Sequence, residues 1–151
     1  MAHLRVGNGD WVLVGDGKKA LLLENHGDAE LLDLRRRSVR AQENPPTAEQ
    51  GTDKPGRSFS SASPGRSSYE STDWHALGEA RFATELATEI NRAAHAQEFR
   101  RLIVIAPPKA LGDLRAAFSK EAQKRILAEI NKDLTHHTIP EIEKLLHGYE
   151  I

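Results

Sequence analysis

The chain has 151 residues, and its 21 Lys and Arg against 22 Asp and Glu give a formal net charge of −1. This length is typical of one domain that can bury a hydrophobic core. The balanced charge argues against a dedicated polyanion binder, and the lack of cysteine excludes disulfides, thiolate metal sites and a cysteine nucleophile.

The first residues and the apolar runs favour a cytoplasmic protein that does not enter a membrane. The N-terminal sequence MAHLRVGNGDW has no apolar stretch of the kind found in secretory signals. The longest apolar runs, at 11–14, 21–23 and 102–106, are too short to cross a bilayer.

Three strands are predicted before residue 45. Residues 11–14 form an apolar run typical of a buried strand, and the Asp16-Gly17 pair that follows favours a tight hairpin. Residues 18–25 then return as a second strand. After a turn at 25–28, residues 30–40 predict a third strand, with three apolar side chains toward the core: Leu32, Leu34 and Val39.

A long segment after Pro45-Pro46 has no buried pattern. Between Gly51 and Glu70, more than half of the residues are Gly, Pro or Ser. Such a composition cannot bury enough surface to offset the entropy lost on ordering. We therefore predict a single domain over residues 1–151 that carries a long flexible loop at 44–72.

A long helix is predicted over residues 74–96. Asp73 is the expected N-cap, with Thr72 as the alternative. An apolar stripe at helical spacing contains Phe82, Leu86 and Ile90. Two charge pairs fit its exposed face, Arg81–Glu85 and Glu89–Arg92.

The rest of the chain continues the alternation of strand and helix. Residues 102–106 are apolar throughout, which is typical of a parallel strand covered on both faces, and Pro108 suits the first turn of a helix. Residues 119–134 fit either helix or strand, and a capping box at 138–141 opens a final helix that Gly148 closes. The order predicts an α/β fold, with three antiparallel strands, then α/β crossovers, in one mixed sheet with helices on its faces.

Five segments resemble the bacterial host attachment protein family, also described as required for attachment to host cells. They cover almost the whole chain: WVLVGDGKKALLLEN, QENPPTAEQGTDKPGRSF, STDWH with RFATELATEINRAA, LIVIAPPKALGDLRAAFS and INKDLTHHTIPEIEKLL. That family is similar to the middle domain of archaeal and eukaryotic class-1 peptide-chain release factors, which has a ribonuclease-H-like sheet. The resemblance implies a five-stranded sheet whose fifth strand is residues 126–132.

The resemblance also bears on the long loop. In the release factors, the loop between the third strand and the long helix carries a Gly-Gly-Gln motif that enters the peptidyl-transferase centre of the ribosome. The corresponding loop here, 51–72, has no Gly-Gly-Gln, and Gln50-Gly51 is the nearest approach in reversed order. The implied placement of the loop is similar, but its peptide-release chemistry is not carried over.

The sequence shows no catalytic or metal-binding constellation. A ribonuclease-H-like nuclease needs carboxylates that converge at strand ends, whereas Asp10 and Asp16 are interpreted as turn residues and 102–106 carries no acid. His136 and His137 would point to opposite faces of a strand, and no third ligand lies at a useful spacing. We therefore expect no enzyme, no cofactor and no metal.

Three other patterns have simpler structural interpretations. Asp73 beside His75 suits a helix cap better than a proton-transfer pair. Residues 15–18 lack the spacing of a phosphate-binding loop and open a hairpin. Lys109 follows a central strand at a helix start, a place that favours anions, but a strand-to-helix turn explains it more simply.

Positive charge is concentrated on the third strand and the loop, at Arg35, Arg36, Arg37, Arg40, Lys54, Arg57 and Arg66. One interpretation is an edge strand whose charges prevent aggregation. The other is a phosphate-binding patch in which aromatic side chains stack on bases. The candidate nucleic-acid-binding set is Arg35, Arg37, Lys54, Arg57, Arg66, Phe59 and Tyr69.

Two functions are compatible with these features. The first is a non-catalytic binding module of the host attachment family that contacts RNA or the ribosome through the basic loop 51–72. The second is a cytoplasmic factor that affects bacterial attachment to host cells through protein contacts alone. A hydrolase ranks last, because no catalytic constellation is visible.

Overall fold

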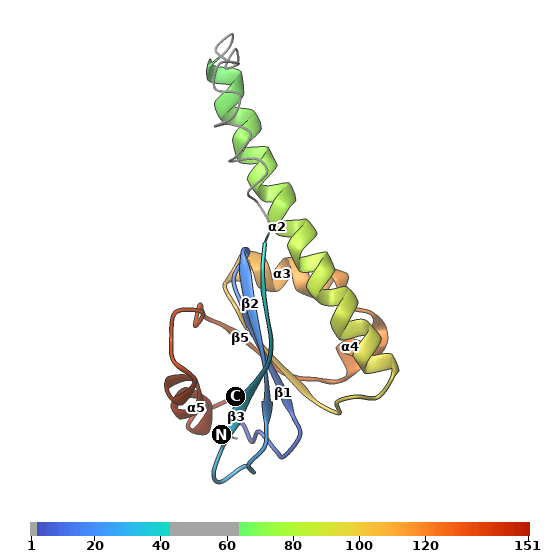
Figure 1. The fold of residues 1–151 in the computed structure, drawn as a ribbon, viewed down its shortest axis with the longest axis vertical. Helices are drawn as coiled ribbons and strands as arrows, with labels where there is room; N and C mark the ends of the chain where they lie inside the picture. The colour runs from blue at the N-terminus through green and yellow to red at the C-terminus, as the bar shows by residue number, and fades with distance from the viewer. Residues whose placement is uncertain (1–2, 43–63) are drawn as a thin grey trace.

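A computed structural model describes residues 3–42 and 64–151, with side chains described for 3–42 and 76–151. One mixed sheet has the strand order β3-β2-β1-β4-β5. Helices α2, α3 and α4 cover one face of the sheet and α5 covers the other (Figure 1). The predicted α/β architecture is confirmed.

Strands β1 (Trp11–Gly15) and β2 (Lys19–Asn25) form the predicted antiparallel hairpin. Its turn is held by Asp16, whose Oδ1 accepts hydrogen bonds from the Lys18 and Lys19 amides at 2.7 and 2.8 Å. This is the turn role expected for Asp16, because aspartate readily bonds backbone amides two residues ahead. Residues 15–18 therefore open a hairpin, as predicted.

Strand β3 (Leu34–Ala41) begins four residues later than predicted. The Asp28 carboxylate accepts hydrogen bonds from the Glu30 and Leu31 amides, so these amides are taken up by a turn instead of a sheet ladder. Asn25 extends the turn by accepting from the Asp33 amide at 2.9 Å.

A β-bulge in β3 changes which side chains face which side of the sheet. Leu22 is opposite Ser38 and Leu23 is opposite Arg36, so Arg37 is the extra residue. Strict alternation would place residue 40 on the face of Leu34. The bulge instead turns Arg40 toward α2 and Val39 away from it.

The predicted core position of Val39 is wrong, because its side chain is 57% exposed. Helix α5 covers only the start of β3, where Glu143 accepts a hydrogen bond from the Leu34 amide. Val39 lies beyond that cover on the edge strand. Leu34 is buried and Leu32 is half-buried, as predicted.

Helix α2 (Pro64–His95) begins ten residues before the predicted start at 74, so residues 64–72 are helical and the predicted loop at 44–72 ends too late. Residues 43–63 lie outside the described residues. Proline suits a first helical turn, and 66–77 contain no Gly or Pro, which are the residues that oppose helix most strongly. Asp73 and Thr72 are therefore inside the helix and not its cap.

The apolar stripe of α2 faces the sheet as predicted, with Phe82, Leu86 and Ile90 buried. The predicted charge pairs differ from those observed in the described residues. Glu89 forms an ion pair with Arg40 of β3, and Arg92 forms one with Glu98 at 2.9 Å. Glu89 and Arg92 both find partners outside the helix, because neighbouring segments bring an arginine and a glutamate closer.

The second half completes the parallel part of the sheet. Strand β4 (Leu102–Ala106) runs parallel to β1 and to β5 (Ile126–Asn131). Helices α3 (Pro108–Ala117) and α4 (Lys120–Lys124) connect β4 to β5. The strand expected from the family resemblance is therefore confirmed, and the helical alternative applies only to the residues before it.

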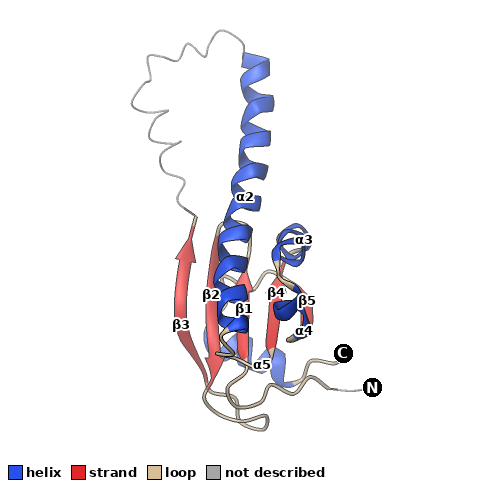
Figure 2. Ribbon diagram, turned by 90° about the vertical axis from the view of Figure 1, so that its right-hand side faces the viewer, coloured by secondary structure: helices blue, strands red, loops and turns tan. Residues whose placement is uncertain are grey.

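The sheet separates two hydrophobic cores. Toward α2, the core contains Trp11, Leu13 and Phe99, and toward α5 it contains Val12, Ile103 and Ile142. Helix α5 (Ile139–His147) begins with the predicted capping box, in which Thr138 and Glu141 bond each other's amides. Figure 2 shows the two termini side by side, where His3 and Glu150 form a β-bridge.

Candidate functional site

The arginines of β3 do not form a single surface. Arg37 lies with its guanidinium 4.4 Å from the centre of the Trp11 ring, on the α2 side of the sheet. Arg35 shares that side by alternation, whereas Arg36 shares the opposite side with Leu34. The structure therefore splits the predicted cluster between the two faces of the edge strand.

Most of these arginines already have acidic partners. Arg35 pairs with Asp33 at 2.9 Å, Arg37 pairs with Glu24 at 2.8 Å, and Arg40 pairs with Glu89. The hydrogen bond that Arg35 donates to Asp33 raises the pKa of Arg35 above its usual value. Among the described residues, Arg36 is the one β3 arginine without an ion pair. Exposed pairs of this kind contribute little to stability, so a phosphate can compete for them.

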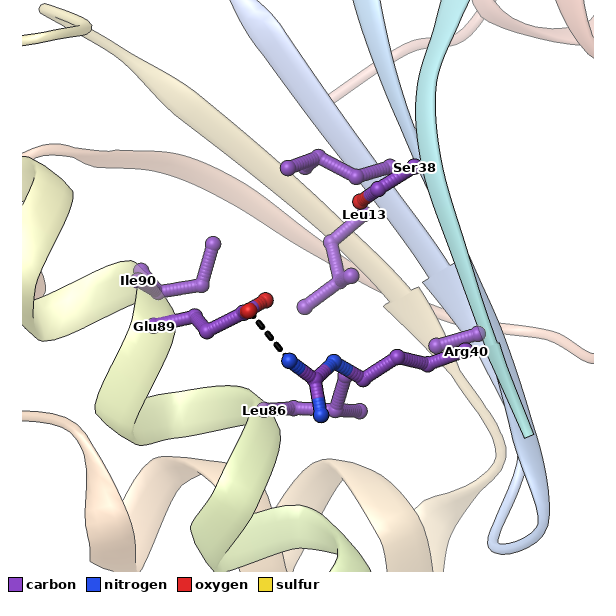
Figure 3. Close-up of a pocket in the computed structure, with 8 residues that line it drawn as sticks. Leu13, Ser38, Arg40, Leu86, Glu89 and Ile90 are labelled. Atoms are coloured by element: carbon purple, nitrogen blue, oxygen red, sulfur yellow. Dashed lines mark hydrogen bonds and ion pairs between the residues drawn. The ribbon is translucent and has the colours of Figure 1, made fainter. Parts of the chain in front are cut away.

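A small pocket lies between β3 and α2 (Figure 3). Arg40 and Glu89 meet across its mouth, and Leu13, Leu86 and Ile90 form its apolar wall. Its enclosed space fits about one water molecule, which is too little for a substrate. The pocket is therefore a gap in the packing of the helix on the sheet.

The loop residues of the candidate set are not tested by the structure. Lys54, Arg57 and Phe59 lie outside the described residues. Arg66 and Tyr69 belong to the backbone of α2, but their side chains are not described, and the same holds for Asp73 and His75. Their roles stay predictions.

The carboxyl end of the sheet carries a group of three potential metal ligands. Asp16 follows β1, and Asp133 and His136 follow β5. Their potential ligand atoms all lie within 4.8 Å of one another. In the folded chain, His136 therefore has two carboxylates close to it that the spacing in the sequence does not indicate. The overlooked signal was position, since Asp16 and Asp133 each follow a strand of the parallel sheet, whose carboxyl ends share one edge.

Thr135 links the two carboxylates of this group. Its hydroxyl lies 2.6 Å from Asp133 Oδ1 and 3.3 Å from Asp16 Oδ2. The Thr135 hydroxyl is the main cause of a lowered pKa of Asp133, and the nearby charges of His136 and Lys19 add to it. Asp133 is therefore an anion at neutral pH.

The amino end of the same sheet is built differently. Asp10 is 3% exposed, and its Oδ2 accepts from the Gly7 amide at 2.7 Å and pairs with Arg101 at 2.9 Å. A buried carboxylate with these partners is satisfied by the protein itself. Asp10 holds the residues before β1 against the residue before β4.

Lys109, at the carboxyl end of β4, is also paired. Its ammonium lies 2.9 Å from Asp113 and 3.8 Å from Glu79, and the hydrogen bond to Asp113 raises the pKa of Lys109. These contacts agree with the interpretation of a strand-to-helix turn.

Comparison with known protein families decides the family of this chain. Residues 10–146 match the family described as bacterial archaeo-eukaryotic release factor family 12. The chain belongs to this family. A search of curated proteins found no match.

Membership of release factor family 12 agrees with the release-factor resemblance noted in the sequence. The matched residues include all five strands of the sheet, helices α2, α3 and α4, and most of α5. The sheet and the helices that cover it are therefore part of the family domain. Within the described residues, no helix is long and apolar enough to span a membrane.

Proposed function

We propose that this member of release factor family 12 is a non-catalytic module that binds the ribosome or ribosomal RNA. The observation that carries the proposal is the match of residues 10–146 to a release-factor family. Release factors of the similar archaeal and eukaryotic class act on the ribosome through the loop that precedes the long helix. The lack of Gly-Gly-Gln here is the reason for proposing binding without peptide release.

The position of α2 supports this function. The 32 residues of the helix give it a length of about 48 Å, and its first residue, Pro64, is at the end farthest from the sheet (Figures 1 and 2). The amino end of α2 therefore lies well away from the packed domain. The sequence before Pro64 contains Lys54 and Arg57, which are the right groups for phosphate contacts.

A second candidate is the cytoplasmic factor that affects attachment to host cells through protein contacts alone. Four large apolar side chains that are exposed among the described residues favour a protein partner: Leu31 at 77%, Val39 at 57%, Leu77 at 57% and Ile151 at 55%. Scattered exposed apolar residues are common on monomers, so this support is weaker. The two candidates differ in salt dependence, because phosphate contacts release counterions and apolar contacts do not.

Co-sedimentation with ribosomes across a salt series tests the first function. We expect the protein to pellet at low salt, and the Arg57→Ala/Arg66→Ala variant to pellet less. Each phosphate contact to single-stranded RNA contributes about −0.7 to the slope of log affinity against log salt, so losing two contacts reduces the slope by about 1.4.

A charge-matched variant makes this test specific. Arg92→Ala/Arg115→Ala also removes two positive charges, but these arginines pair with Glu98 and Glu129 on other parts of the surface. The control should pellet like the wild type. Absence of pelleting at low salt, or equal loss in both double variants, contradicts ribosome binding through the basic loop.

A further inference from the structure

The fold assembles a group of metal-ligand side chains at the carboxyl end of its sheet. β1 and β5 both run parallel to β4, so Asp16 and Asp133 reach the same edge although 117 positions in the chain separate them. His136 joins them from the turn after β5. All three side chains are at least partly accessible to solvent, so an ion can reach them.

The carboxylates keep oxygen atoms available for a ligand. Asp16 uses Oδ1 to hold the hairpin turn, and Asp133 uses Oδ1 to hold Thr135. The Thr135 hydroxyl has one proton, so it cannot satisfy both Asp133 and Asp16. Neither carboxylate forms an ion pair with Lys or Arg among the described residues. Lys19 lies near Asp133 but forms no ion pair with it, and the two neighbouring carboxylates together still attract a cation.

The histidine separates this group from an ordinary acidic cluster. Imidazole nitrogen and carboxylate oxygen together suit zinc and related transition ions, whereas magnesium prefers an all-oxygen shell. Ligands about 2.1 Å from a tetrahedral zinc lie about 3.4 Å apart. The ligand atoms lie within 4.8 Å of one another, so they must approach by up to about 1.4 Å to reach this spacing.

We propose that Asp16, Asp133 and His136 bind a divalent transition-metal ion, with zinc as the ion that the three ligands favour. Three protein ligands leave a fourth position for water. Thr135 acts beside the ion by orienting Asp133. This site is independent of the proposed ribosome contact, because none of its residues belongs to the basic loop.

Zinc binding to the full chain, measured by equilibrium dialysis after treatment with a chelator, tests the site. We expect the wild type to bind one zinc ion and His136→Gln to bind at least about tenfold more weakly. His137→Gln is the matched control, because His137 pairs with Glu141 at 3.2 Å and is not part of the group. This control should bind zinc like the wild type.

Two conservative variants extend the test to the carboxylates. Asp16→Asn and Asp133→Asn keep an oxygen for the turn bonds and remove the charge, so both should weaken zinc binding while the circular dichroism stays unchanged. In NMR spectra, zinc should shift the amide signals of Lys18, Lys19 and Thr135. Equal binding by His136→Gln and the wild type, or no binding by the wild type at micromolar zinc, overturns the proposal and leaves a solvated surface cluster.

Discussion

Strand β1 has one aspartate at each end, and the two aspartates are used in opposite ways. Asp10, at the amino end, is buried and paired with Arg101. Asp16, at the carboxyl end, is partly exposed and faces another carboxylate and a histidine. The residue types are identical, but the first is neutralised by the protein and the second is left with unused ligand capacity.

This difference teaches where ligand chemistry can be sought in the fold. At the amino end, Arg101, which precedes the parallel strand β4, neutralises the charge of Asp10. At the carboxyl end, Asp16 and Asp133 lie close together, and neither forms an ion pair with Lys or Arg among the described residues. The β3 arginines resemble the amino end, because three of the four have acids nearby. A high density of charge in the sequence is therefore a poor guide to free charge on the surface.

The largest expected effect comes from breaking the amino end. Asp10→Ala should lower the free energy of unfolding by about 2–3 kcal/mol, because the Gly7 amide and Arg101 lose a buried acceptor. Arg101 is half-exposed, which keeps the cost below that of a fully buried pair. Urea unfolding measures the change.

Asp16→Asn is the matched comparison for that prediction. It keeps the turn acceptor and is partly exposed, so we expect a change within about 0.5 kcal/mol. If Asp16→Asn lowered the free energy of unfolding more than Asp10→Ala does, the two ends of β1 would not differ in the way described.

A smaller effect is expected from two neighbouring arginines. Arg37→Ala should cost about 1 kcal/mol, because the side chain covers the buried Trp11 ring and pairs with Glu24. It should also change the tryptophan fluorescence. Arg36→Ala should stay within about 0.5 kcal/mol, since Arg36 is exposed. If both substitutions lowered the free energy of unfolding equally, the contribution of these arginines would not depend on the face of the edge strand.

The smallest predicted effect is on the pH dependence of stability. The lowered pKa of Asp133 stabilises the folded state above the unfolded pKa near 3.8, and this contribution is lost as pH falls through the folded pKa. Asp133→Asn should therefore lose less stability than the wild type when acidified below about pH 4. Thermal melting in acidic buffers measures the stability of the two proteins. If both lose the same stability on acidification, Asp133 does not contribute in this way.

Local patterns predicted most of the sheet. The apolar run of β4 and the Asp16-Gly17 turn depend on neighbouring residues, so both were found from the sequence. The start of α2 was missed because the Ser-rich composition before Trp74 suggested a loop, although Pro64 suits a helix start. The bulge at Arg37 has no local signature, so the faces of Val39 and Arg40 were not predictable.

The candidate sites show the same difference between features set by neighbouring residues and features set by the fold. The β3 arginines are consecutive in the sequence and were easy to find, but their acidic partners Glu24 and Glu89 come from other elements. The group of Asp16, Asp133 and His136 exists only once β1 and β5 are aligned on β4. Asp16 and His136 were each interpreted singly from the sequence, and Asp133 was not considered.

Anomalous diffraction at the zinc absorption edge tests most directly whether the carboxyl end of the sheet is a ligand-binding end. Crystals grown with zinc should give a peak bounded by Asp16, Asp133 and His136, with no comparable peak at Asp10. A peak between the three ligands would confirm the difference between the two ends of β1. Full zinc occupancy elsewhere, with none at this group, would contradict it.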